Sequence, residues 1–258
     1  MTKVCIIIPC INLWERYTKE CVHSVQNAIL ELLCQDGDYE VITLLIDNAS
    51  EDNTEESGKH LQSDSFFYKR NDEPMSFSES VNYGVNFAWE KECNYAFVIN
   101  NDTIIHQESI IQLLKRFKKG DCGMVTCYDI SRGQYSDAKS LYTIKASYMS
   151  KVEEAEHPNF SAFMIDKKTW DKVGEFDINF KPAYFEDNDY HRRMQLKGIK
   201  AIVYPKALFH HYASKTWSEG LAVSASIKRR LFENNKQYYI NKWGGIPGEE
   251  TFTKPFNK

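Results

Sequence analysis

The sequence predicts an α/β fold in which a mixed, mainly parallel sheet is flanked by helices. Apolar runs of strand length alternate with helix-spaced segments four times in the first half of the chain, as in strand–helix–strand units. The first run, Val-Cys-Ile-Ile-Ile between Lys3 and Pro9, is apolar throughout and stops at a proline, which is typical of a buried parallel strand. Right-handed crossovers between such strands bring their carboxyl ends to one edge of the sheet.

The composition is that of one large domain with a substantial core. The chain has 258 residues, 42% hydrophobic and 14% aromatic, with a formal net charge of −4. This charge argues against a general binder of nucleic acid or membrane surfaces, although a local basic patch is compatible with it. The seven scattered cysteines lack CxxC spacing and are expected to be reduced thiols of a cytoplasmic protein. No apolar run approaches the roughly 20 residues that span a bilayer, and no signal peptide is expected.

The first half of the chain supplies the alternating elements. The spacing of Cys21, Val25 and Ile29 indicates the first helix, which Asp36-Gly37 ends. Ser76 and Glu79 have capping-box spacing at the start of a later helix. After the first strand we therefore expect a helix at 14–33, a strand at 39–46, a helix from 52 to 61, a strand at 66–68, a helix from 76 and a strand at 95–99.

The second half is less regular. A polar, acidic segment at 131–158 indicates either a mobile excursion or a pair of weak strands. A strand at 199–204 is expected to end at Pro205. The remaining expected elements are a helix at 109–118, a strand at 123–128, a strand at 160–165, a helix at 167–173, a helix near 186–193, a long helix at 221–243 and a tail from 244.

Polar side chains follow four of the expected strands where each strand ends. These segments are Pro9–Asn12, Asp47–Ser50, Lys69-Arg70 and Asn100–Asp102. By itself Asn100-Asn101-Asp102 fits a simple turn, because such side chains form turns through their own hydrogen bonds. A carboxylate at a strand end is also how α/β proteins build metal–phosphate sites. Four polar ends on one edge predict a ligand site there.

An acidic cluster opens one of the later helices. In Glu186-Asp187-Asn188-Asp189, the helix dipole and an i,i+4 pair with Arg193 explain Asp189. They do not explain the two adjacent carboxylates before it. Such neighbours repel, which raises the pKa of at least one and suits that group to proton abstraction.

Two further clusters are open to more than one interpretation. His210-His211 fits ordinary partly buried histidines or, beside Asp102, ligands for Mn²⁺ or a related ion. The basic run Lys228-Arg229-Arg230 is expected to be the solvated face of a helix. Neither GxxxxGK[ST] nor GxGxxG occurs in the sequence, so the usual P-loop and dinucleotide folds have no support.

These motifs, in this order and spacing, resemble the inverting nucleotide-sugar glycosyltransferases of the GT-A fold, in the large group of rhamnosyltransferase-like and polysaccharide-building enzymes. The resemblance covers nearly the whole chain and implies a Rossmann-like sheet with a C-terminal helix and tail. The pieces that carry it are Ile6–Asn12, Leu45–Ser50, Asn82–Gly84, Ile99–Thr103, Phe185–Arg193 and Pro205–Ser214. It also implies a glycosyltransferase domain at 1–220, with a nucleotide-binding half at about 1–130 and an acceptor half at about 131–220, on which residues 221–258 pack.

The resemblance implies a role for each candidate residue. The resemblance implies that the nucleotide is held by Pro9, Cys10, Ile11 and Asp47, with Asp47 accepting a hydrogen bond from a uracil-type N–H. Asn12 and Asn82 are expected to support this pocket. The Asp-x-Asp motif maps onto Asn100-Asn101-Asp102, so Asp102 is the expected metal ligand while Asn100 and Asn101 are supporting or sugar-contacting amides. The Glu-Asp pair maps onto Glu186 and Asp187, with Asp187 as general base. His211 is the expected second metal ligand and His210 the alternative. The segment Asp72–Pro74 has no clear equivalent of the family's basic diphosphate contact.

The implied reaction is a metal-assisted single displacement. Mn²⁺ or Mg²⁺ and a nucleotide-sugar donor, with a UDP-sugar favoured, are the expected cofactor and co-substrate. The acceptor is a glycan, a lipid-linked molecule or another hydroxyl compound. Two other functions stay open: a non-catalytic nucleotide- or carbohydrate-binding protein, and a glycosyltransferase acting on modified nucleic acid bases, which the acidic balance disfavours.

Overall fold

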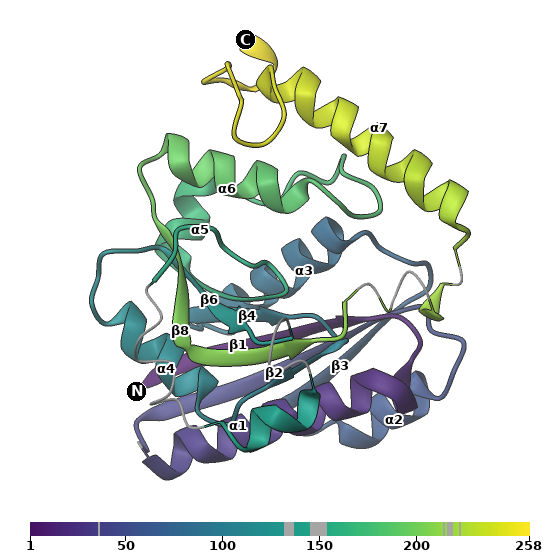
Figure 1. Cartoon of the computed structure of the whole chain (residues 1–258). Helices are drawn as coiled ribbons and strands as arrows, with labels where there is room; N and C mark the ends of the chain where they lie inside the picture. The colour runs from purple at the N-terminus through teal and green to yellow at the C-terminus, as the bar shows by residue number, and fades with distance from the viewer. Residues whose placement is uncertain (36, 132–136, 145–153, 214, 216–218, 222) are drawn as a thin grey trace.

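The strands form one twisted sheet (Figure 1). The structure is a computed structural model that describes all of the chain except residues 36, 132–136, 145–153, 214, 216–218 and 222. Within the described residues the sheet has eight strands in the order β3-β2-β1-β4-β7-β6-β8-β5. The strands are β1 Thr2–Cys10, β2 Tyr39–Asn48, β3 Phe66–Asn71, β4 Tyr95–Ile99, β5 Thr103–Ile105, β6 Met124–Asp129, β7 Ala162–Asp166 and β8 Ala201–His211.

Helices cover both faces of this sheet (Figure 1). They are α1 Lys19–Gln35, α2 Thr54–Leu61, α3 Phe77–Glu90, α4 Ser109–Phe117, α5 Lys167–Val173, α6 Glu186–Leu196 and α7 Ala225–Trp243. Short helical turns are η1 Trp14–Thr18, η2 Ala138–Tyr142 and η5 Pro255–Asn257. The expected helix at 14–33 is thus observed as η1 followed by α1. The capping box at Ser76 and Glu79 is confirmed, since each side chain accepts from the other's backbone N–H.

The core lies in two layers because successive side chains of a strand point to opposite faces of the sheet. In β1, Val4, Ile6 and Ile8 pack with α1 and α4, whereas Cys5 and Ile7 pack with α3 on the other face. Gly84 of α3 lies so close to Ile7 that an added Cβ would overlap its side chain. The continuous apolar run that predicted a buried strand is explained by these two covered faces.

Strand directions confirm the predicted mixed, mainly parallel sheet. The pairs β1·β2, β1·β4 and β2·β3 are parallel, so the ends of these strands share one edge. Strand β7 runs antiparallel between β4 and β6. The four polar segments therefore do meet at one edge, as expected from the alternation of strands and helices.

Strand β8 corrects the expectation that a strand ends at Pro205. It continues to His211, and its register with β6 shifts between Cys127–Tyr204 and Tyr128–Leu208. Pro205 falls within this irregularity, where a residue without an N–H costs no ladder hydrogen bond. The extension of β8 pairs antiparallel with the unpredicted strand β5, which places Thr103 opposite His211.

The C-terminal helix α7 is fixed to α6 by a buried carboxylate. Asp189 accepts from Trp243 Nε1 at 2.9 Å and from Arg193 Nε at 2.9 Å, and it pairs with Lys242 Nζ at 2.6 Å. Half of the expected polar segment at 131–158 lies outside the described residues, as does Ser214. The described half includes η2. All seven cysteines are free. None of the described helices is long and apolar enough to cross a membrane.

Candidate active site

A cavity of about 860 Å³ opens at the carboxyl ends of the parallel strands. It gathers residues from β1, from the turn after β4, from the end of β8 and from the start of α6. Most of the candidate residues named from the sequence line it: Pro9, Cys10, Ile11, Asn100, Asn101, Asp102, Glu186, Asp187 and His211. A volume of this size accommodates a ligand larger than a single sugar.

Asp102 and His211 lie side by side in the lining of the cavity. His211 Nε2 is 3.2 Å from Asp102 Oδ1, because β5 and β8 pair with Thr103 opposite His211. The other oxygen, Oδ2, accepts from the Lys215 N–H at 3.1 Å. His210 is not part of the cavity lining and packs instead on Tyr212, with ring centroids 4.9 Å apart. Geometry therefore places His211, and not His210, beside the carboxylate.

The donor set of this pair fits a divalent cation. Two ligands at right angles and about 2.1 Å from one metal lie about 3 Å apart, close to the distance between Asp102 Oδ1 and His211 Nε2. A carboxylate with an imidazole suits Mn²⁺ or a related ion. Among the described residues no third His, Cys, Asp or Glu joins them. Any further ligands would come from a bound molecule or water.

The amides before Asp102 are held in different ways. Asn101 Nδ2 donates to Thr18 Oγ1 of η1 at 2.9 Å, which fixes the turn against the end of the first helical segment. The Asn100 carbonyl accepts from Thr103 Oγ1 at 2.6 Å, and its N–H donates to Ser161 O at 2.9 Å. Both residues border the cavity, and these bonds hold the turn that carries Asp102.

Glu186 and Asp187 face the cavity from the first turn of α6. Glu186 is buried, and among the described residues its Oε2 has no hydrogen-bond partner. Burial, reinforced by the charge of Asp187, raises the pKa of Glu186 well above its ordinary value. Burial also raises the pKa of Asp187, although the Asn188 N–H, donating at 2.8 Å, partly opposes that rise. This environment makes Asp187 a stronger proton acceptor than an exposed aspartate.

The backbone just before this pair is strained. Tyr184 and Phe185 have φ angles of 83° and 70°, which side chains with a Cβ rarely adopt. Helix α7 holds them there. Asn235 Nδ2 donates to Ala183 O at 2.8 Å, and the Phe232 ring packs against Phe185 with centroids 5.1 Å apart.

Asn235 is a site-supporting residue that the sequence analysis missed. Its signal was present in the helical spacing of Phe232, Asn235, Tyr239 and Trp243, which share one face of α7. Of these four, Asn235, Tyr239 and Trp243 are buried.

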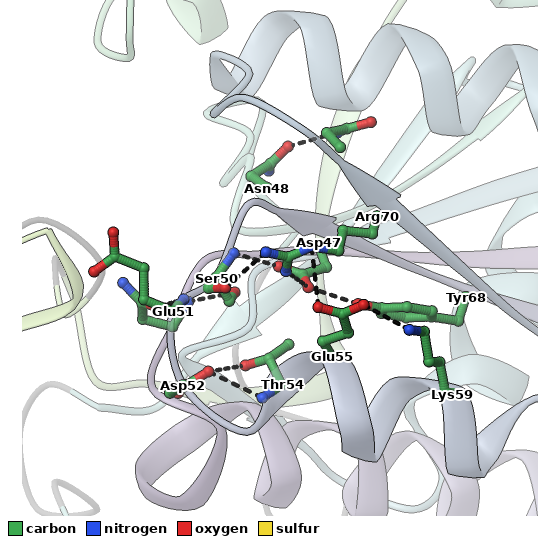
Figure 2. Close-up of polar contacts among 12 residues, drawn as sticks. Asp47, Asn48, Ser50, Glu51, Asp52, Thr54, Glu55, Lys59, Tyr68 and Arg70 are labelled. Carbon is green, nitrogen blue, oxygen red and sulfur yellow. Dashed lines mark hydrogen bonds and ion pairs between the residues drawn. The ribbon is translucent and has the colours of Figure 1, made fainter.

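Asp47 lies behind the cavity lining, in the polar cluster of Figure 2. Its side chain is fully buried and accepts from the Ser50 N–H at 2.9 Å, Tyr68 OH at 2.6 Å and Arg70 Nη1 at 2.7 Å. Burial alone would raise the pKa of Asp47, but the hydrogen bonds from Ser50, Tyr68 and Arg70 outweigh it and lower the pKa. A base N–H would have to share or displace one of these donors.

Asn12 and Asn82 also lie outside the lining of the large cavity. Asn12 donates to Gly220 O at 2.9 Å, accepts from the Glu51 N–H at 2.7 Å, and borders a second hollow of about 420 Å³. Asn82 exchanges two hydrogen bonds with the Phe176 backbone, at 2.9 and 2.8 Å. Asn82 thus fixes α3 to the segment that leads into α6.

Comparison with known proteins gives a family and a fold. Residues 5–175 match the model of the family described as "Glycosyl transferase family 2". No curated protein matches the chain. Among solved structures, "Crystal structure of GalNAc-T7 with UDP, GalNAc and Mn2+" is similar at a TM-score of 0.62 and 13% identity, over 93% of this chain and 50% of that one. The chain thus spans half the length of that protein, and at this identity the likeness shows a shared fold.

Proposed function

The chain belongs to glycosyl transferase family 2 and has the GT-A fold, and from that premise we propose that it is an inverting, metal-dependent enzyme using a nucleotide-diphosphate sugar, with a UDP-sugar favoured. The acceptor is a hydroxyl compound. The observation that carries this proposal is the placement of Asp102, His211 and Asp187 on one cavity. It combines a cation-binding pair with a separate proton acceptor.

Asp102 and His211 are the residues that would hold Mn²⁺ or Mg²⁺. When bound, the cation neutralises negative charge on the diphosphate and so stabilises the leaving nucleotide. Pro9, Cys10 and Ile11 at the end of β1 would contact the nucleotide, and Asn100 and Asn101 would contact the sugar or support the turn. The GalNAc-T7 structure, whose description names UDP, GalNAc and Mn²⁺, supports the same choice of ligands for this fold.

Asp187 is the proposed general base. It takes the proton from the acceptor hydroxyl while the acceptor oxygen bonds to the anomeric carbon and the bond from that carbon to the diphosphate oxygen breaks. Attack from the face opposite the leaving group inverts the configuration. The raised pKa of Asp187 strengthens it as a proton acceptor.

A panel of nucleotides and nucleotide sugars tests this function. The full chain is melted in the presence of each compound, with and without Mn²⁺, and the incubations are then analysed by mass spectrometry. We expect one nucleotide sugar to raise the melting temperature only with the metal, and to yield free nucleoside diphosphate with a transferred or hydrolysed sugar. If a nucleotide sugar raises the melting temperature but no donor is turned over with any glycan, lipid-linked or other hydroxyl acceptor, the chain is instead a non-catalytic binding protein.

A further inference from the structure

The first turns of α7, with Leu221 just before the helix, carry a cluster of cations and apolar side chains that the proposed reaction does not use. We define this basic–apolar patch as Leu221, Ile227, Lys228, Arg229, Arg230 and Phe232. Every residue from 225 to 234 is exposed or half-buried, and the first buried residue of α7 is Asn235. In the view of Figure 1 this part of the helix extends past α6 toward the edge of the molecule.

The three cations of the patch are available for a ligand. Within the described part of the chain, Lys228, Arg229 and Arg230 form no ion pair. Lys242 near the C-terminal end of the same helix is buried and pairs with Asp177 and Asp189, whereas among the described residues the three cations of the patch have no such carboxylate. These three adjacent positive charges form a local basic cluster in a chain whose net charge is −4.

Large apolar side chains lie among these cations instead of in the core. Leu221 is 37%, Ile227 42% and Phe232 39% exposed. Ile227 and Leu231 are four residues apart and so occupy the same side of the helix, next to the side that carries Lys228. An exposed helical segment with both cations and large apolar residues is the pattern of a helix that lies at a lipid–water interface.

The patch lies at the mouth of the candidate active site. Leu221 and Phe232 also line the large cavity, and Phe232 packs on Tyr184 and Phe185, which directly precede Glu186. An acceptor that reaches Asp187 on this side passes the patch. A surface bound to the patch is therefore next to the opening of the cavity.

We propose that the basic–apolar patch binds the surface of a bilayer containing anionic phospholipid, and that the enzyme takes a lipid-borne acceptor from that surface. The second clause rests on the proposed function; the first does not. Lipid phosphates pair with Lys228 and Arg230, which flank the side of the helix that carries Ile227 and Leu231, while Ile227 inserts among the acyl chains. Arg229 lies on the opposite side of the helix and adds to the local positive charge. A nucleic acid backbone would use the cations but would leave the exposed apolar residues without a role.

Vesicle flotation with the full chain tests the proposal without any donor sugar. We compare vesicles of phosphatidylcholine alone with mixed vesicles of phosphatidylcholine and phosphatidylglycerol. The unmodified protein should float with the mixed vesicles and not with phosphatidylcholine. Lys228→Gln/Arg229→Gln/Arg230→Gln should weaken binding on the order of 100-fold, because each cation near an anionic surface contributes about fivefold. In high salt, which screens the cations but not the apolar contact, Ile227→Ser should weaken the vesicle binding that remains.

A charge-matched control separates the patch from the overall charge. Lys115, Lys168 and Lys206 are exposed lysines on other elements, and changing all three to Gln removes the same net charge. This control should keep vesicle binding. Failure of the unmodified chain to bind anionic vesicles, or equal losses in the two triple variants, would overturn the proposal. Tighter binding to DNA or RNA than to vesicles, unaffected by Ile227→Ser, would overturn it in favour of a nucleic acid partner.

The outcome is distinguishable from a failure of the proposed function. Hydrolysis of the donor by water needs no bilayer, so the patch variants should retain it. If the patch variants lose vesicle binding but keep donor hydrolysis, both proposals are supported. If the unmodified protein binds vesicles but turns over no donor, the membrane-binding proposal stands and the proposed enzymatic function is contradicted.

Discussion

At the scale of residues, the contact between Asp102 and His211 defines the proposed cation site. The sequence left His210 and His211 as alternatives because adjacent histidines have no local feature that separates them. The choice depends on the register between β5 and β8, which joins segments more than a hundred residues apart. Neighbouring strand residues point to opposite faces, so one histidine must turn away from Asp102.

Removing either member of this pair should weaken metal-dependent donor binding. We expect Asp102→Ala and His211→Ala each to lower donor affinity in Mn²⁺ by more than about tenfold, the lower bound for changes to groups that support a metal ligand. Calorimetry with and without Mn²⁺ measures this, and exposed His60→Ala is the control. Equal donor affinity with and without metal in the unmodified protein would contradict the assignment.

The buried Glu186 and the half-buried Asp187 give a pH dependence of stability with a defined sign. Both pKa values are raised in the folded chain, so folding favours the protonated forms. Their contribution to stability is complete below the ordinary range of a carboxyl and is lost as the pH rises through the raised values. Glu186→Gln should therefore raise the melting temperature at neutral pH and flatten its decline between mildly acidic and neutral pH. If Glu186→Gln instead lowers the melting temperature at neutral pH, the Glu186 carboxylate is stabilising in its charged form.

At the scale of elements, the strands and helices of the first half follow from local pattern. The capping box of Ser76 and Glu79 predicts the start of α3, and the apolar run before Pro9 predicts β1. Strand β5 was missed because three residues carry too little periodicity to register. Strand β8 was cut short because proline ends strands in most contexts, and only the irregular pairing with β6 accommodates Pro205.

Helix α7 contributes to the site through contacts that no local pattern could reveal. Asn235 is expected to act as a positioning residue, because its amide bonds to Ala183 O hold the strained turn before Asp187. Asn235→Ala should cost about 1 kcal/mol of stability and lower kcat while leaving the KM for the donor unchanged. The neighbouring exposed Asn234→Ala should change neither. A purely structural role would reduce stability in Asn235→Ala without the selective fall in kcat.

At the scale of the whole molecule, the candidate site combines residues from the first and the second half of the chain. The parallel strands β1, β2 and β4 supply the edge that the sequence predicted from repeated polar strand ends. The second half supplies His211, Glu186 and Asp187 through β8 and α6. The sequence could single out these candidate residues because their types and order are distinctive, whereas their convergence on one cavity depends on long-range packing. Asp47 shows the same limit, since its neighbours Tyr68 and Arg70 lie on another strand (Figure 2).

In the proposed mechanism Asp187 accepts the proton of the acceptor hydroxyl, at a cavity whose donor site is built by other residues. The most direct measurement compares turnover and donor affinity in Asp187→Asn, with exposed Asp64→Asn as the matched control. We expect sugar transfer to fall by at least about 100-fold, the lower range for loss of a general base, while the calorimetric donor affinity in Mn²⁺ stays within error. Near-normal transfer by Asp187→Asn would contradict this mechanism.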